Sequence, residues 1–271
     1  MNNTRTTLQT LEKDSNMRFQ VRRMLTGLAW SVFGIGGLCL SLTYFPWLNI
    51  SEKDKDIRVR KARKMISKSF NLFFTFTRLT GVMNREIEGI DELRKVKGTV
   101  IVANHPTILD YVLIASRLPE VDCLVKADLT HNFFLKGVVR AADYLLNDAS
   151  ESLVEECRRR LGAGENILIF PEGTRTIPGK PLKLHRGVAH IALRCNAPIE
   201  TIRIHCSHRW LDKSSEWYEI PPSKPTITVK RSETIKSSDF INPLEDGYSL
   251  AARRLRKLCK MLDSSQWPLE T

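Results

Sequence analysis

The sequence predicts an α/β fold with a mostly parallel central sheet flanked by helices and an N-terminal, membrane-embedded extension of two helices. Short apolar runs typical of buried strands alternate with helical patterns, which favours such a sheet. An apolar stretch without charges, Met24 to Leu48, precedes them. We expect three segments: a polar tail at 1–20, a membrane-associated helical segment at 21–82 and an α/β domain at 83–271.

As a helix, the stretch from Met24 to Leu48 would be about 37 Å long, enough to span or deeply enter a bilayer. Several glycines and Pro46 interrupt it, so a bent or re-entrant helix stays open beside a full span. Lys and Arg are more numerous after the stretch than before it, which places that side in the cytoplasm. We therefore expect a location at the cytoplasmic face of a membrane, the inner membrane if the source is bacterial.

The next segment, 57–82, repeats apolar residues at helical spacing after a basic start. We interpret it as a helix lying in the membrane interface, with its cations near lipid phosphates. A core helix of the domain is the alternative.

The chain has 271 residues, a formal net charge of +12 and a pI of about 9.6. A basic surface suits anionic lipid or nucleic acid. The sequence carries no nucleic-acid motif, so we expect membrane lipids as partners and no nucleic acid. Its cysteines lack Cys-x2-Cys spacing and indicate free thiols. The His205-Cys206-Ser207-His208 run has no second cluster, so we expect no metal and no tightly held cofactor.

Within the domain, a helix capped by Asp148 or Ser150 is expected to run to Leu161, because its glutamates precede its arginines and complement the helix dipole. A loop rich in Ser, Pro and aromatic residues is expected at 210–225. The apolar patterns predict strands at 99–103, 121–125, 167–169, 198–204 and 226–230, and further helices at 132–142 and 249–262.

Polar residues directly follow two of these strands. The first stretch runs from Asn104 to Asp110, and Pro106 suits the first position of a helix because its φ is pre-set. Asp110 would then fall in the early turns, where its carboxylate can orient the ring of His105 and stabilise the imidazolium. No serine-nucleophile elbow is present, so His105 would activate a hydroxyl of the substrate. Taken alone, this pair is a weak motif and favours a helix-capping or buried histidine beside a local N-terminal charge.

The second stretch runs from Phe170 to Arg175 and is followed by Lys183 and Arg186. Because the carboxyl ends of parallel strands meet at one edge of a sheet, we expect it to share a crevice with His105. Its cations and a helix beginning near His185 would suit an anion such as a phosphate.

The two stretches together resemble the glycerolipid acyltransferases, the family of 1-acylglycerol-3-phosphate acyltransferases. Asn104, His105 and Asp110 match its Asn-His-x4-Asp motif, and Phe170 to Arg175 match Phe-Pro-Glu-Gly-Thr-Arg residue for residue. The resemblance covers roughly 86–204. It implies that 83–271 is an acyltransferase domain in which His105 is the general base and Asp110 orients it. It also implies substrate-binding roles for a set of residues: Lys126, Glu172, Gly173, Thr174, Arg175, Lys183 and Arg186.

The resemblance implies transfer of a fatty acyl group from acyl-CoA or acyl-carrier protein to a lysophospholipid hydroxyl, without a cofactor. The sequence departs from the family at Pro106 and at the second motif, where Asn147-Asp148 lacks the usual arginine. Pro106 and the segment from Val125 to Leu146 are similar to the sequences of family members in specialised bacterial lipid pathways, including those beside aryl-polyene synthesis. A different lipid or pathway-specific acceptor, a non-catalytic membrane-binding protein and a thioesterase therefore stay as alternatives.

Overall fold

The computed structural model describes residues 14–133, 135–147, 151–176 and 187–236. The expected helix at 249–262 lies outside these residues. In the described part, seven strands form one sheet in the order β1-β7-β6-β2-β5-β3-β4, and only the β6–β7 pair is antiparallel. The prediction of a mostly parallel sheet is confirmed. The strands are β1 (Asn84–Glu88), β2 (Val100–Ala103), β3 (Asp122–Lys126), β4 (Leu145–Asn147), β5 (Ile167–Ile169), β6 (Ile199–Cys206) and β7 (Thr226–Ile235).

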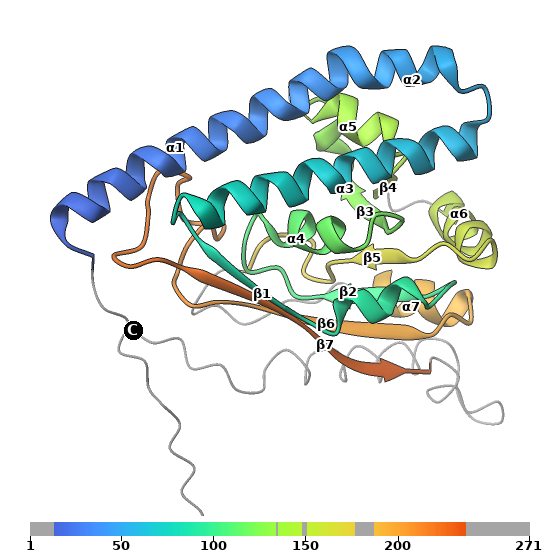
Figure 1. Ribbon diagram of the computed structural model, residues 1–271. Coiled ribbons are helices and arrows are strands. Elements are labelled where there is room, and N and C mark those ends of the chain that lie inside the picture. Colours follow the sequence, from blue (N-terminus) through green and yellow to red (C-terminus); the bar gives the residue numbers. More distant parts are fainter. Residues whose placement is uncertain (1–13, 134, 148–150, 177–186, 237–271) are drawn as a thin grey trace, which may run out of the picture.

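Helices cover both faces of this sheet (Figure 1). Alternate residues of each strand face opposite ways, so Ile101 joins one core cluster while Val100 and Val102 join the other. The first cluster contains α3 (Lys55–Leu79), α4 (Asp110–Arg117) and α5 (Lys136–Ala141). The second contains α6 (Glu151–Gly162) and α7 (Gly187–Arg194). Two 3-10 turns, Ile90–Arg94 and Ala127–Thr130, complete the connections.

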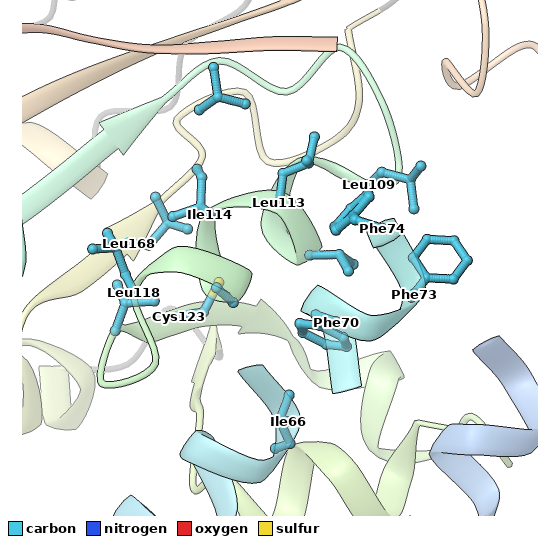
Figure 2. Packing of buried hydrophobic residues seen from close by; sticks show 14 of the residues in the cluster. Ile66, Phe70, Phe73, Phe74, Leu109, Leu113, Ile114, Leu118, Cys123 and Leu168 are labelled. Atoms are coloured by element: carbon cyan, nitrogen blue, oxygen red, sulfur yellow. The ribbon is translucent and has the colours of Figure 1, made fainter. Parts of the chain in front are cut away.

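Helix α3 belongs to the core of the domain. Its Ile66, Phe70 and Phe74 are buried in the same cluster as Leu113 of α4 (Figure 2). The interpretation of 57–82 as an interface helix is therefore wrong for this face of the helix, and the alternative of a core helix holds. The apolar residues at helical spacing are the packing face, and the basic residues lie mostly at the solvated start of the helix. The expected membrane-embedded pair of helices is accordingly not confirmed.

The outermost layer is α1 (Asn16–Cys39), which lies along α3 (Figure 1). It begins inside the expected polar tail, because the side chain of Ser15 caps it by accepting a hydrogen bond from the Arg18 N–H. From Asn16 to Ser51 the chain is apolar and long enough to cross a membrane, by length and composition alone. Its outward face is an exposed apolar stripe: Met17, Val21, Met24, Leu28, Val32, Ile35, Leu42, Trp47 and Ile50.

A five-residue π-helical segment, Leu40–Tyr44, joins α1 to α2 (Phe45–Ser51). In α1 the buried positions Arg22, Thr26 and Ala29 follow the 3.6-residue period, which would bring Trp47 to the buried face. The π turn takes up one extra residue and so rotates α2 by about 100° relative to α1. Phe45 and Leu48 are therefore buried, while Trp47 stays in the outward stripe.

A buried ionic network ties the two helical layers to the start of β3. Asp122 is fully buried. It accepts a hydrogen bond from Arg160 of α6 and forms an ion pair with Arg63 of α3 at 3.2 Å. Arg63 also pairs with Glu165 at 3.0 Å, and Arg160 with Glu156 at 2.7 Å. Burial raises the pKa of Asp122, and the two guanidinium groups oppose that shift. A buried charge with partners on both layers fixes how the layers sit on the sheet.

Candidate active site

The two polar stretches lie side by side at the carboxyl edge of the sheet. Strands β2 and β5 are parallel neighbours, with Val102 opposite Ile169, so the chain leaves both strands at the same level. The backbone of His105 is then held by the second stretch at both polar groups. Its N–H donates to Glu172 Oε1 at 2.8 Å, and its carbonyl accepts from the Thr176 N–H at 2.7 Å.

His105 and Asp110 form a hydrogen-bonded pair. The ring Nδ1 lies 2.8 Å from Asp110 Oδ2, and the ring stacks on Phe170 with the centroids 4.3 Å apart. The ring is partly exposed, whereas Asp110 is fully buried. Nε2 of His105 makes no hydrogen bond to any residue that the structure describes, so this nitrogen is available to a substrate.

Thr107 supports the buried carboxylate. Its hydroxyl donates to Asp110 Oδ1 at 2.5 Å, and its backbone N–H donates to Oδ2 at 2.8 Å. These bonds hold the chain in a turn, so α4 begins at Asp110 and Pro106 is not its first residue. The expectation for Pro106 is wrong because the local side-chain bonds compete with helix formation.

Burial raises the pKa of Asp110, and the hydrogen bonds from His105 and Thr107 oppose that shift. Ionised, the carboxylate can only accept hydrogen bonds, so it orients Nδ1 as the protonated nitrogen. Nε2 then carries the lone pair. This is the tautomer that a base acting through Nε2 requires.

Glu172 acts as a brace in this structure. Its side chain is buried, with Oε1 bound by the His105 N–H and Oε2 by the Thr176 hydroxyl at 2.7 Å. Gly173, at φ 63°, supplies the left-handed residue of the turn that follows Phe170. Thr174 is half-buried beside it. Contact of these residues with a head group stays a prediction.

The cations expected at the site have different placements. Arg175 donates through Nη1 to two backbone carbonyls, those of Leu211 at 3.1 Å and Asp212 at 2.7 Å. Lys126 is exposed at the end of β3, two strands from β2, roughly 10 Å along the same edge. Lys183 and Arg186 lie outside the described residues.

The segment that corresponds to the second motif of the family lacks the usual arginine. It contains strand β4, which we did not predict from the sequence. Lys126 of β3 pairs in register with Asn147 of β4, so both lie near this edge of the sheet. Leu146, which pairs with Val125 one residue earlier, is exposed, and Tyr144 is buried with its hydroxyl bonded to that of Tyr111. The edge therefore carries the amide of Asn147 beside Lys126, where the usual arginine is missing.

Sequence reasoning did not assign Thr176 or the segment at 207–212 to the site. Thr176 lies just past the recognised motif, and its spacing to Glu172 gives a weak signal. Leu211 acts through its carbonyl, which any residue carries. The bond of its carbonyl with the Ile108 N–H, at 3.1 Å, leaves no pattern in the sequence.

Comparison with known proteins agrees with this arrangement. Residues 84–205 match the family model described as Acyltransferase. A 1-acyl-sn-glycerol-3-phosphate acyltransferase of Cocos nucifera is 28% identical over 148 residues, 52% of this chain and 47% of that protein. One of Helicobacter pylori (strain J99) is 30% identical over 132 residues, 46% of this chain and 54% of that protein. The chain thus spans about half the length of these curated relatives.

A solved structure shares the fold. The crystal structure of the 1-acyl-sn-glycerophosphate (LPA) acyltransferase PlsC from Thermotoga maritima superposes with a TM-score of 0.65 at 18% identity. The match covers 93% of this chain and 99% of that one. Residues 84–205 thus match a domain of the acyltransferase class, and the chain shares its fold with a solved member. The 1-acyl-sn-glycerol-3-phosphate acyltransferases are among the curated proteins to which this part of the chain is similar.

Proposed function

We propose that the protein is an O-acyltransferase. It moves a fatty acyl group from acyl-CoA or acyl-carrier protein to the hydroxyl of a lysophospholipid such as 1-acylglycerol-3-phosphate. The observation that carries the proposal is the His105–Asp110 pair, whose Nε2 is left for a substrate. The names of the relatives support the substrate class.

In this reaction Nε2 of His105 takes the proton of the acceptor hydroxyl as its oxygen attacks the thioester carbonyl. Asp110 holds the opposite nitrogen and stabilises the imidazolium that forms. When the tetrahedral intermediate collapses, the C–S bond breaks and the thiolate leaves with the proton from His105. The products are an ester and a free thiol, and no redox step is needed.

The acyl chain has a candidate groove at the helical layer. An apolar cavity of about 340 Å³ lies between α1, α3 and α5, among Phe33, Leu40, Phe70, Phe73 and Val138. The cavity lies on the side of the molecule that carries the apolar stripe, which supports entry of the acyl chain from a bilayer. We propose that α1 rests in the cytoplasmic face of the membrane through that stripe.

The first test is acyl transfer by the purified protein in liposomes, for the wild type and His105→Ala. Labelled acyl-CoA and acyl-carrier protein serve as donors, with lysophosphatidic acid and other lysolipids as acceptors. Loss of the base should lower the rate about 10²–10⁴-fold. Equal rates would refute His105 as the base. Release of free acid without acceptor would identify a thioesterase instead.

A different acceptor is the second candidate, because the second motif lacks its arginine and exposes Leu146. The same acceptor panel decides it. A clear preference for lysophosphatidic acid would remove this alternative, and a preference for an acceptor without a phosphomonoester would favour it.

Membrane association is tested on the stripe itself, since removing 1–82 would delete the core helix α3. The double change Leu28→Ser and Ile35→Ser alters two exposed residues and should shift the protein from liposomes to solution. Glu155→Ser on α6, at the opposite face of the sheet, is the control. Unchanged liposome binding by the double variant would refute this placement.

A further inference from the structure

The loop between β6 and β7, residues 207–225, connects two distant parts of the molecule. We call it the strap. At its base His208 bridges Ser207 and Ser223, each at 2.8 Å. Figure 1 shows the loop between β6 and β7 reaching up to α1. The strap is thus closed at its base and extended towards the outermost helix.

One end of the strap holds the arginine of the second stretch. Nη1 of Arg175 has two protons, and both are used by the carbonyls of Leu211 and Asp212. Nε and Nη2 make no hydrogen bond to residues that the structure describes. These two nitrogens form the edge that can bind an anion with two parallel hydrogen bonds. The strap therefore determines which edge of Arg175 faces a ligand.

The turn that presents these carbonyls is tightly specified. Asp212 is buried, and its Oδ1 accepts from the N–H groups of Ser214 and Ser215 at 2.6 and 2.9 Å. Leu211 takes a positive φ of 56°, which a non-glycine residue adopts only when its surroundings require it. The carbonyl of Leu211 also accepts from the Ile108 N–H, next to the His105 loop. The same turn thus contacts both catalytic loops.

The other end of the strap is fastened to α1. Arg22 is buried and donates through Nη2 to the Pro221 carbonyl at 2.6 Å and through Nε to Asp14 at 2.8 Å. The Asp14 N–H in turn donates to the Pro222 carbonyl at 3.1 Å. Buried Arg22 thus holds both a strap carbonyl and Asp14, whereas the neighbouring Arg23 is exposed.

We propose that the strap is a positioning device for the anionic group of the acceptor. Asp212 shapes the turn that orients Arg175, and Arg22 anchors the strap to the helix that carries the apolar stripe. Asp212 and Arg22 are then positioning residues for acceptor binding, 190 residues apart in the chain. The identity of the acceptor in this inference rests on the proposed function. The contacts of Arg175, Asp212 and Arg22 are independent of it.

The kinetic test compares Asp212→Ala with Asp212→Asn, which keeps an oxygen for the Ser214 and Ser215 N–H groups. Asp212→Ala should raise KM for lysophosphatidic acid about tenfold, the size of one hydrogen bond, with kcat and KM for the donor little changed. Asp212→Asn should restore KM. An unchanged acceptor KM in Asp212→Ala, or an equal fall of kcat in both variants, would overturn the proposal.

Arg22→Ala tests the anchor, with Arg23→Ala as the matched control. Amide hydrogen exchange on the full chain should speed up across 207–225 in Arg22→Ala and stay at the wild-type rate in Arg23→Ala. This readout needs no turnover. If the wild type acylates no lysolipid, the proposed function fails while the exchange result still decides the anchor. Equal exchange in both arginine variants would refute it.

Discussion

At the scale of single residues, the position of His105 depends on the side chains of Asp110, Thr107 and Glu172. Asp110 is fully buried, so each hydrogen bond to its carboxylate offsets part of the cost of keeping a charge away from water. Thr107 supplies two of these bonds and Glu172 holds the backbone of His105. The geometry of the proposed base is therefore set by its neighbours.

Replacing Thr107 with Val keeps the shape of the side chain but removes the hydroxyl donor to Asp110. We expect a loss of about 1.5–3 kcal/mol in the free energy of unfolding, the usual size of a hydrogen bond to a charged group. The rate of acyl transfer should fall as well, because the carboxylate is less firmly held. Urea unfolding and initial rates measure both effects. Thr107→Ser should resemble the wild type, and a stable Thr107→Val would contradict the role.

Two variants of Glu172 separate a brace from a charge that binds the head group. Glu172→Gln keeps an oxygen for the His105 N–H and should retain most of the activity if the brace is the main role. Glu172→Ala loses both bonds and should reduce kcat strongly, since the His105 loop is released. Steady-state rates at saturating donor compare them. A Glu172→Gln variant as inactive as Glu172→Ala would show that the negative charge itself is needed.

At the scale of elements, the π segment fits closely against α5. A methyl group added at Gly137 would lie 2.3 Å from Ser41 Oγ and 3.3 Å from Ser41 Cα, too close for either to stay in place. The absence of a side chain at Gly137 thus allows the π turn, which keeps Trp47 in the outward stripe, to pack on the domain. The close packing of Ser41 against Gly137 indicates that the π turn must keep this geometry to fit against α5.

Gly137→Ala should therefore destabilise the protein by about 1–3 kcal/mol, the cost of overpacking a fitted contact. Gly27→Ala, in α1, is the control because no atom lies within 4 Å of its added methyl group. It should stabilise the helix by up to about 1 kcal/mol. Thermal unfolding in detergent compares the two. Equal melting temperatures would mean that the π segment moves freely against α5.

Part of this arrangement could be predicted from the sequence and part could not. The apolar runs that alternate with helical patterns predict the sheet, and the two motifs that follow strand ends predict the pairing of their loops, because these are local properties of the sequence. Burial of α3 was only the alternative prediction, because the basic start of that helix and the apolar stretch before it favour a membrane interface. The π turn has no residue type that marks it. The bonds of Arg175 are made to backbone carbonyls, which leave no pattern.

At the scale of the whole molecule, stability is linked to pH through Glu156. Its hydrogen bonds to Arg159 and Arg160 lower its pKa from 4.5 to about 2. Because the folded pKa lies below the unfolded one, this carboxylate stabilises the fold above about pH 4.5, and the contribution is lost as the pH falls towards 2. Arg160 also reaches Asp122, so loss of this bond weakens the network that joins the layers.

Glu156→Gln should be less stable than the wild type at pH 7 and approach it as the pH falls towards 2. Urea midpoints measured along this range check the prediction. Glu155→Gln is the control, since Glu155 forms one exposed pair with Arg158 and should contribute at most about 1 kcal/mol. A constant difference between Glu156→Gln and the wild type at every pH would contradict the linkage.

The anchor of α1 joins positions 199 residues apart, because Arg22 bonds the carbonyl of Pro221. During synthesis at roughly 5–20 residues per second, α1 leaves the ribosome many seconds before its partner exists. Contacts of such long sequence separation form late in folding, so they chiefly slow unfolding. In that interval the apolar stripe is already present on the nascent chain. The helix is then free to meet a lipid surface first, and the domain would assemble against a helix that already lies there.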